Sequence, residues 1–466
     1  MRVFMLGWEF PPFISGGLGT ACYGLTKAMS GIGTDILFVL PRPVSTPFST
    51  HVRLVSPKPG SPLEMPASEF RLDEFENVTF RTIESQGMYD PYARPEEYAE
   101  GQKKTVRVVE ERTKEKRAVR IEPAMTGAGA TASAAGTGQP AQAPKQQSTG
   151  PGTHYAGDLF GEIQRYATLA SEIARNEKFD VVHAHDWMTF PAGLAVAGIS
   201  GKPLVVHVHS TEFDRAGMNI DTRIYDIERR GMQGAMKVIA VSSLTKTLVT
   251  HHYGIDPSKV EVVYNAIETN GSYDEERYKI HKDEKIVLFL GRITMQKGPE
   301  YFLAAAKRVL EVMENVKFVM AGSGDMIRRT IEMAASMGIG HKVLFTGFLR
   351  GGDVDRVFKM ADLYVMPSVS EPFGIAPLEA MSHDVPVLIS KQSGVSEVIQ
   401  HALKCDFWDV EEMANKIIAV LRHPPLASTL RQHGSFEIKR MSWTDAAKRC
   451  VDVYEEAVGA MGQKKN

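Results

Sequence analysis

Two glutamates and a short run of backbone amides lie close together in the chain and could bind a ligand that carries both hydroxyl and phosphate groups. Glu371 falls in a predicted turn, and Glu379 falls in the first turn of the helix that follows. Between them, the backbone N–H groups of Phe373, Gly374 and Ile375 precede the helix and could face an anion. A nucleotide sugar carries both kinds of group and would suit this combination. The alternative interpretation is an ordinary strand-to-helix turn with solvated glutamates.

Two basic side chains earlier in the same half could bind a diphosphate. Residues 286–290 are an apolar run typical of a buried parallel strand, and Arg292 and Lys297 follow it in a loop. Ligands of parallel α/β sheets bind at the carboxyl ends of the strands. A guanidinium offers a bidentate fork and an ammonium a compact point charge, and both suit phosphate oxygens. Solvated surface charges are the alternative interpretation.

A glycine-rich turn near the N-terminus is a second candidate anion site. It contains Gly16 and Gly17, follows an apolar run over residues 2–7, and precedes a helix predicted from about residue 20 to 30. A strand, a glycine turn and a helix N-terminus in succession bind anions readily. The spacing differs from the Rossmann fingerprint, and a tight turn alone would also explain these glycines.

Histidines and carboxylates follow two predicted strands of the N-terminal half. His183 and His185 alternate in one strand and so lie on one face, a pattern that could hold a metal ion. Because no cysteine or third histidine is placed convincingly to complete a site, the sequence favours no metal. The strand over residues 203–208 runs into a polar loop, where His209 and Glu212 could contact hydroxyl groups of an acceptor. A hydrated loop is the alternative.

Composition excludes several classes of protein. The 466 residues are 43% hydrophobic and 24% charged, which suggests two or three ordinary domains with full cores. The formal net charge of −2 gives no electrostatic reason to expect nucleic acid as a partner. The three cysteines show no CxxC spacing, so a reducing cytoplasm is expected. No signal peptide and no apolar run long enough to span a bilayer is evident. The sequence does not predict an oligomeric state.

Strands alternate with helices in both halves of the chain. This predicts an α/β protein with two doubly wound parallel-sheet domains that face each other across a cleft. Because phosphate-type loops occur in both halves, the ligand is expected between them. Residues 46–121 show little pattern beyond possible strands at 52–55 and 78–83. The predicted boundaries are 1–267 for the N-terminal domain with a low-complexity, disordered insertion at about 124–153, 268–440 for the C-terminal domain, and 441–466 for an amphipathic helix that packs back on the N-terminal domain.

Three of these segments together resemble the signatures of a known enzyme family. Glu371-Pro-Phe-Gly, with Glu379 after seven intervening residues, is similar to the donor-site motif of retaining glycosyltransferases with the two-domain GT-B fold. The His-Ala-His-Asp-Trp segment that ends at Trp187 and the Gly-Arg…Lys-Gly pattern around Arg292 are also similar to family motifs. The chain resembles glycosyltransferase family 4, with glycogen and starch synthases as relatives, over nearly its whole length except about residues 60–155.

The resemblance implies a reaction and its partners. It implies transfer of a hexosyl group, with glucosyl preferred, from ADP- or UDP-glucose to a hydroxyl of a growing α-glucan. The configuration would be retained by front-face attack assisted by the leaving phosphate, and neither a metal nor another cofactor would be needed. The synthases carry a basic residue just before the glycine turn. Ile14 and Ser15 occupy that place here, which favours family 4 over the bacterial-type synthases.

The resemblance also implies roles for individual residues. His185 would lie at the reacting end of the donor sugar, and Asp186 would contact the acceptor or close the cleft. Glu371 would bind the far hydroxyls of the donor sugar and Glu379 the ribose, while the basic pair neutralises the departing diphosphate. The predicted catalytic residues are His185, Glu371, Arg292 and Lys297; the donor-binding residues are Gly16, Gly17, Arg292, Lys297, Gly322, Phe348, Leu349, Glu371, Phe373, Gly374, Ile375 and Glu379; and the weaker acceptor-binding candidates are Glu9, Asp186, His209 and Glu212.

Three other functions remain open from the sequence. The nearest is a family 4 transferase with a lipid-linked, trehalose-forming or sucrose-forming acceptor. The second is a nucleotide-sugar epimerase on the same fold, which would turn over its substrate without an acceptor. The third is a catalytically silent glucan-binding protein, for which loss of Arg292, Lys297 or Glu371 would be the sign, and none of the three is lost.

Overall fold

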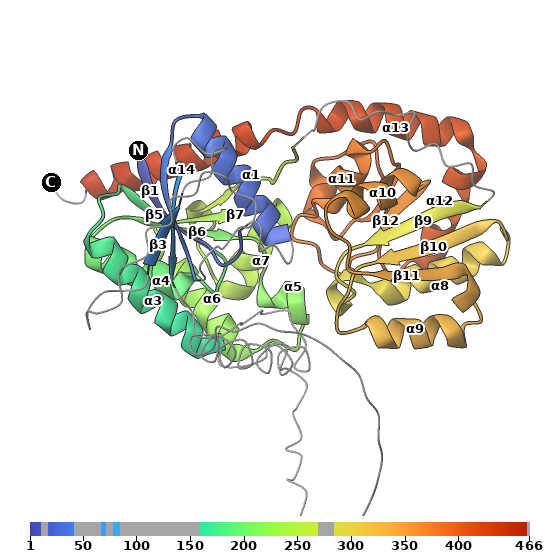
Figure 1. The fold of residues 1–466 in the computed structure, drawn as a ribbon, viewed down its shortest axis with the longest axis horizontal. Coiled ribbons are helices and arrows are strands. Elements are labelled where there is room, and N and C mark those ends of the chain that lie inside the picture. The colour runs from blue at the N-terminus through green and yellow to red at the C-terminus, as the bar shows by residue number, and fades with distance from the viewer. Residues whose placement is uncertain (11–16, 42–66, 71–77, 84–158, 269–283, 464–466) are drawn as a thin grey trace, which may run out of the picture. The chain divides into compact units, whose positions relative to one another are not determined.

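The computed structural model describes two α/β sheets and the helices that surround them (Figure 1). Residues 1–85 and 160–466 fall in one compact unit, so the two sheets are described together. Gly16, the low-complexity segment, the possible strand at 52–55 and nearly all of the predicted hinge lie outside the described residues. The described residues are 1–10, 17–41, 67–70, 78–83, 159–268 and 284–463, and no side chain is described within 67–83.

Within the described residues the N-terminal sheet has eight strands and is parallel except at one edge. Its central strands are buried along nearly their whole length, as parallel strands covered by helices must be. The antiparallel edge strand departs from the predicted parallel sheet, and the sequence pattern did not reveal it. In spatial order the strands are β3 (Ala67–Phe70), β4 (Val78–Ile83), β2 (Asp35–Leu40), β1 (Arg2–Leu6), β5 (Val181–His185), β6 (Leu204–Val208), β7 (Lys237–Ala240) and β8 (Val260–Val262), of which β3 is antiparallel to β4.

Helices connect the parallel strands of this sheet. Several begin at a side chain that accepts a hydrogen bond from a backbone N–H, as when Ser242 Oγ accepts from Thr245 N at 3.0 Å. The first helix begins at Gly17, three residues earlier than predicted, so this glycine belongs to the helix and not to the preceding turn. The helices are α1 (Gly17–Gly31), α3 (Leu159–Arg175), α4 (Phe190–Ser200), α5 (Glu212–Ala216), α6 (Thr222–Gly234) and α7 (Ser243–Tyr253), with the 3₁₀ turn η1 (Pro257–Lys259).

The C-terminal sheet has six strands among the residues that the structure describes, and all of them are parallel, as predicted. Its strands in spatial order are β11 (Val343–Gly347), β10 (Val316–Ala321), β9 (Lys285–Leu290), β12 (Leu363–Met366), β13 (Val387–Ser390) and β14 (Leu403–Cys405). Its helices are α8 (Pro299–Leu310), α9 (Ile327–Ser336), α10 (Gly352–Met360), α11 (Ala376–Ser382), α12 (Val410–Arg422) and α13 (Pro424–Ile438), with the 3₁₀ turns η3 (Met295–Lys297), η4 (Gly340–Lys342) and η5 (Gly394–Glu397).

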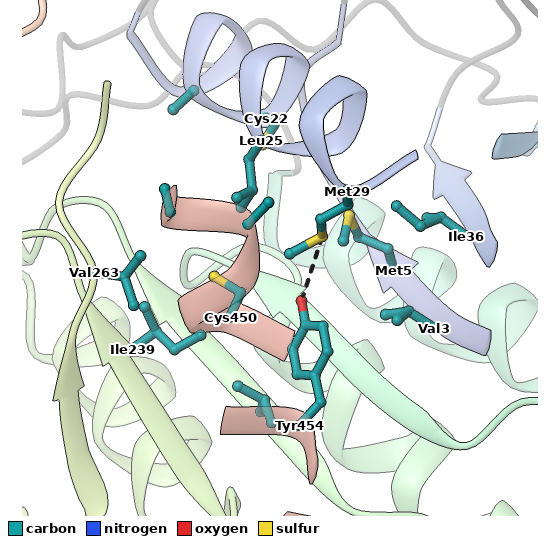
Figure 2. Close-up of a cluster of buried hydrophobic side chains, with 14 of the residues drawn as sticks. Val3, Met5, Cys22, Leu25, Met29, Ile36, Ile239, Val263, Cys450 and Tyr454 are labelled. Carbon is teal, nitrogen blue, oxygen red and sulfur yellow. Dashed lines mark hydrogen bonds between the residues drawn. The ribbon is translucent and has the colours of Figure 1, made fainter. Parts of the chain in front are cut away.

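The last helix, α14 (Trp443–Gln463), packs on the N-terminal sheet beside α1, which confirms the predicted return of the chain. Figure 2 shows Cys450 and Tyr454 of this helix within a buried cluster that also contains Met29 and side chains of the first strand. The two helices approach closely because Gly24 has no side chain: a Cβ there would lie 2.3 Å from Trp443 Cε2. The C-terminal helix is therefore part of the core of the N-terminal half.

None of the helices within the described residues is both long and apolar enough to cross a membrane.

Candidate active site

The structure brings the predicted phosphate-binding lysine and the predicted sugar-binding glutamate together. Lys297 lies at the end of η3, and its ammonium forms an ion pair with Oε2 of Glu371. The same carboxylate oxygen accepts a hydrogen bond from Ser368 Oγ at 3.2 Å. The lysine side chain is 20% exposed and the glutamate side chain 8% exposed. Because both groups are largely withdrawn from water, their charges interact more strongly than a surface pair would.

The turn that contains Glu371 has the predicted strand–turn–helix form. It follows β12 and enters α11, and it is held by hydrogen bonds from Glu371 N to Gln392 O at 3.0 Å and from Val395 N to Phe373 O at 2.7 Å. Gly374 has φ +98°, a backbone region that favours glycine. Phe373 is buried, so its side chain anchors the turn in the core. The turn is thus a fixed platform and not a loose loop.

Arg292 follows strand β9, which is adjacent to β12. It lies at the carboxyl-terminal end of the sheet, where β10 and β11 also end. The backbone of Gly291 hydrogen-bonds to Ala321 O at 3.0 Å, and Gly322 N hydrogen-bonds to Gly347 O at 2.8 Å. A Cβ on Gly322 would lie 1.9 Å from Gly291 O, so this glycine allows the loop that carries the arginine to pack against β10. The structure gives Gly322 this packing role, and its predicted contact with the donor remains a prediction.

Phe348 and Leu349 come directly after β11, so they lie at the edge where Arg292 also lies. Phe348 is 51% exposed and Leu349 is half-buried. The guanidinium of Arg350 stands 5.2 Å from the centre of the Phe348 ring. Ring surface of Phe348 is therefore exposed at this end of the sheet, and the predicted contact of the two residues with the donor remains a prediction.

Glu379 lies in the first turn of α11, the helix that follows the Glu371 turn, and is half-buried. Burial raises the pKa of this carboxyl to about 7, and the negative charge of Asp355 adds to the effect. Near neutral pH the group is poised between its two forms. A ligand that donates hydroxyl hydrogen bonds to the carboxylate would favour the ionised form.

Replacing Glu379 with glutamine is expected to stabilise the free protein above pH 7. The native carboxyl keeps its proton between about pH 4.5 and 7 while the unfolded one loses it, so the wild-type free energy of unfolding falls as pH rises through this window. The Gln variant does not undergo this loss. Its free energy of unfolding should therefore exceed that of wild type by roughly 1–3 kcal/mol at pH 8 and by little at pH 4.5. Denaturant unfolding at pH 8 and pH 4.5 measures this difference in stability, and Glu332→Gln, at an exposed position, is the control. An equal difference between variant and wild type at the two pH values would contradict the prediction.

Four histidines meet at the carboxyl ends of β5 and β6. The register places His185 opposite His207, and the two-residue period of a strand brings His183 and His209 to the same face. The ring centroids are 4.2 Å apart for His183 and His185 and 5.3 Å apart for His185 and His207. The expectation that no third histidine is placed to complete a metal site is therefore wrong. The repeated His-x-His at the ends of consecutive parallel strands was the signal that could have revealed the cluster.

The histidine predicted to meet the donor sugar is fully buried. His185 Nδ1 lies 2.9 Å from His209 Nε2, and the ring stacks on its neighbours. Burial lowers the pKa of His185, and the neighbouring His183 adds to the effect, so the ring is neutral near pH 7. Its role at the reacting end of the donor remains a prediction.

Asp186, directly after this strand, adopts a left-handed backbone with φ +60°. Its Oδ1 accepts hydrogen bonds from the backbone N–H groups of His209 at 2.7 Å and Ser210 at 3.3 Å. Burial raises the pKa of Asp186 to about 7, although the nearby Arg215 opposes the shift. The carboxyl ties the two loops together, and a contact with the acceptor remains a prediction.

The sequence missed Arg215, which organises the loop of acceptor candidates. Its guanidinium lies 3.2 Å from Glu212 Oε2, 2.5 Å from Glu228 Oε1 and 2.7 Å from Ser210 Oγ. Glu212 also accepts a hydrogen bond from Asp221 N at 3.1 Å, so its carboxylate is already used inside the protein. Glu9 is likewise buried. Contacts of Glu9, Glu212 or His209 with an acceptor remain predictions.

Residues from the two halves of the chain touch beside the Lys297–Glu371 pair. Ser370 Oγ donates a hydrogen bond to Asp214 Oδ1 at 2.5 Å, which links the turn of Glu371 to helix α5. Glu397 of η5 accepts hydrogen bonds from the backbone N–H groups of Ser243 and Leu244, each at 2.8 Å, and so caps α7. The sequence could not pair these residues, because they lie more than a hundred positions apart.

The chain also matches known protein families and structures. A relative, an uncharacterised glycosyltransferase of Methanocaldococcus jannaschii, is 35% identical over 62% of this chain and 78% of its own length. A glycogen synthase of Mycobacterium tuberculosis is 23% identical over 97% of this chain and 94% of its own. The catalytic domain of starch synthase IV from Arabidopsis thaliana, solved with ADP and acarbose, superposes with a TM-score of 0.66 at 14% identity, covering 98% and 99% of the two chains. Family matches are a starch synthase catalytic domain over residues 2–112, glycosyltransferase family 4 over 134–270 and glycosyl transferases group 1 over 273–435.

The chain has two doubly wound sheets, parallel except for the edge strand β3, and a C-terminal helix that returns to the first sheet. Together with the ion-paired cationic site at the carboxyl-terminal end of the second sheet, these features define a GT-B enzyme. The similarities above agree, and the chain belongs to the GT-B glycosyltransferases, enzymes that transfer a sugar from a nucleotide-sugar donor. The family resemblance seen in the sequence is thereby confirmed.

Proposed function

We propose that this enzyme transfers a glucosyl group from ADP- or UDP-glucose to a hydroxyl of a growing α-glucan with retention of configuration. The observation that carries the proposal is the Lys297–Glu371 ion pair, which lies at the same carboxyl-terminal end of the C-terminal sheet as Arg292. A carboxylate paired with one cationic side chain, with a second cationic side chain at the same end of the sheet, suits a ligand in which sugar hydroxyls adjoin a diphosphate. The glycogen synthase and starch synthase relatives support a glucan as the acceptor.

The two cationic side chains have the main part in the reaction. Negative charge grows on the diphosphate as the glycosidic bond to the donor breaks, and Lys297 and Arg292 would stabilise that charge. The ion pair holds the ammonium near the proposed site before the donor binds, so the ammonium would need only to turn from the carboxylate to the phosphate. We propose that no metal takes part in this step, since the two side chains supply the cationic charge.

The other groups would position the donor and the acceptor. Glu371 would accept hydrogen bonds from the far hydroxyls of the donor sugar once its ammonium partner turns to the phosphate. Glu379 would accept from the ribose hydroxyls, and the backbone after β11 would face the nucleobase. We place His185 near the anomeric carbon, where attack on the face that the diphosphate leaves gives retention.

We further propose that the enzyme works in the cytoplasm. Cys22, Cys405 and Cys450 are all free and buried, which supports the reducing compartment that the sequence predicts.

A donor and acceptor screen tests the proposal. Purified protein is incubated with ADP-, UDP- and GDP-sugars, with and without glycogen, and release of the nucleoside diphosphate is measured. Release that requires both a glucose donor and glycogen, with an α-linkage in the NMR spectrum of the product, is expected. Epimerisation without acceptor, or transfer only to a lipid-linked, trehalose-forming or sucrose-forming acceptor, would overturn the glucan assignment.

A further inference from the structure

Three buried histidines carry ring nitrogens that the fold leaves without a hydrogen-bond partner. His183 Nε2, His185 Nε2 and both ring nitrogens of His207 have none, and all three side chains are at most 1% exposed. Buried polar groups in proteins are nearly always paired, because an unpaired one loses its hydrogen bonds to water and gains nothing in exchange. Three such rings in one cluster require an explanation of their own.

We propose that His183, His185 and His207 form a buried site for one divalent transition-metal ion, with Zn²⁺ as the favoured ion. One ring nitrogen from each of the three lies within 4.8 Å of the other two. Zinc binds histidine nitrogens at about 2.0–2.1 Å, which places tetrahedral ligand atoms about 3.4 Å apart. Small rotations of the three rings, which come from two adjacent strands, would close that difference. This proposal assigns the ring of His185 to the ion, so only the backbone of this residue would be left to face the donor sugar.

The partners of the outer nitrogens favour this arrangement. Tyr454 donates its hydroxyl hydrogen to Met29 Sδ, at 3.9 Å (Figure 2), and its oxygen also contacts His183 Nδ1. In the tautomer that a metal site requires, this oxygen accepts the Nδ1–H of His183, and the lone pair of Nε2 stays available for the ion. His209 Nε2, 2.9 Å from His185 Nδ1, can do the same for the second ring. Metal-binding histidines are commonly held through their other nitrogen in this way.

The ligand chemistry limits the choice of metal. Three imidazoles suit Zn²⁺ and neighbouring transition metals, whereas Mg²⁺ and Ca²⁺ prefer oxygen ligands. Three protein ligands leave a fourth position for water. Among the described residues a second set, Cys22, His185 and His209, also has one ligand atom from each within 4.8 Å. We favour the three histidines because each has a buried ring nitrogen without a hydrogen-bond partner. Substitution of Cys22 then serves as a control that distinguishes the two sets.

Metal content and a cobalt spectrum test the site. Full-length protein is stripped with a chelator, loaded with Zn²⁺, desalted and assayed for zinc per chain, and its affinity is measured by calorimetry. Wild type should retain one zinc per chain, and His207→Gln should weaken binding at least tenfold. Cys22→Ser and the exposed His341→Gln should bind as wild type does. With Co²⁺, wild type should show tetrahedral bands and no thiolate charge-transfer band.

Several results would overturn the proposal. Equal zinc retention by wild type and His207→Gln would place the ion elsewhere, and loss of zinc in Cys22→Ser would assign it to the thiol set. Wild type that retains no zinc after desalting would leave the rings as packing residues. If His207→Gln does not fold, as judged by circular dichroism, His183→Gln serves in its place with the same expected loss.

Discussion

Replacing Lys297 with alanine should lower turnover by about two to three orders of magnitude, the range seen when one preorganised charge-stabilising group is removed from an active site. The ammonium is held by Glu371 at the strand edge where the donor diphosphate is proposed to lie, so its loss removes charge that is needed most as the leaving group departs. Steady-state kinetics with the donor found in the screen measures the effect, which should fall mainly on kcat.

A matched lysine separates this effect from general damage. Lys342 is also partly buried, at 19% exposure, and pairs with Glu284 at 2.8 Å, but it precedes β11 and so lies at the opposite edge of the same sheet. Lys342→Ala should therefore leave turnover near that of wild type. Near-normal turnover in a folded Lys297→Ala protein would instead remove the assignment of this lysine to the diphosphate.

The same substitution should also change stability, and a double variant distinguishes the two effects. Lys297→Ala leaves the Glu371 carboxylate, which is 8% exposed, without its ammonium partner, at a cost of about 1–3 kcal/mol. Adding Glu371→Gln removes the stranded charge, so the double variant should recover most of that stability while its turnover stays low. Recovery of both properties together would mean that the lysine acts only through the fold.

Replacing Arg215 with methionine should lower the free energy of unfolding by about 3–5 kcal/mol, because it leaves two buried carboxylates without their cation. The side chains of Arg215, Glu212 and Glu228 are 9%, 4% and 3% exposed. Tyr253 also donates its hydroxyl hydrogen to Glu228, so the loss would extend to the packing of α7 against α6. Denaturant unfolding followed by circular dichroism measures the change.

Two further variants define the cause of this loss. Arg223 pairs with Asp221 at 2.6 Å, but its side chain is 62% exposed, so Arg223→Met should cost less than about 1 kcal/mol. Combining Arg215→Met with Glu212→Gln and Glu228→Gln removes the unpaired charges and should restore part of the stability. If Arg215→Met is as mild as Arg223→Met, the buried cluster does not hold this loop.

Local sequence patterns were enough to predict much of the fold. Apolar runs such as residues 286–290 predicted strands at the right places, and the last helix was predicted to return to the N-terminal half, as it does. Helix starts shifted by a few residues, as at Gly17, because the end of a helix depends on capping and packing as well as on periodicity. The edge strand β3 escaped prediction, since four residues offer little pattern.

The sequence by itself determined which residue types stand at the carboxyl ends of the strands, because strand periodicity and loop motifs are local properties of the chain. Only the tertiary structure decided which of them meet. It paired Lys297 with Glu371, 74 positions later, and set the register that gathers four histidines on one face. It also buried Arg215 between two carboxylates. Register and burial depend on how distant segments pack, and burial decides whether a charged or polar side chain keeps its water or must find a partner.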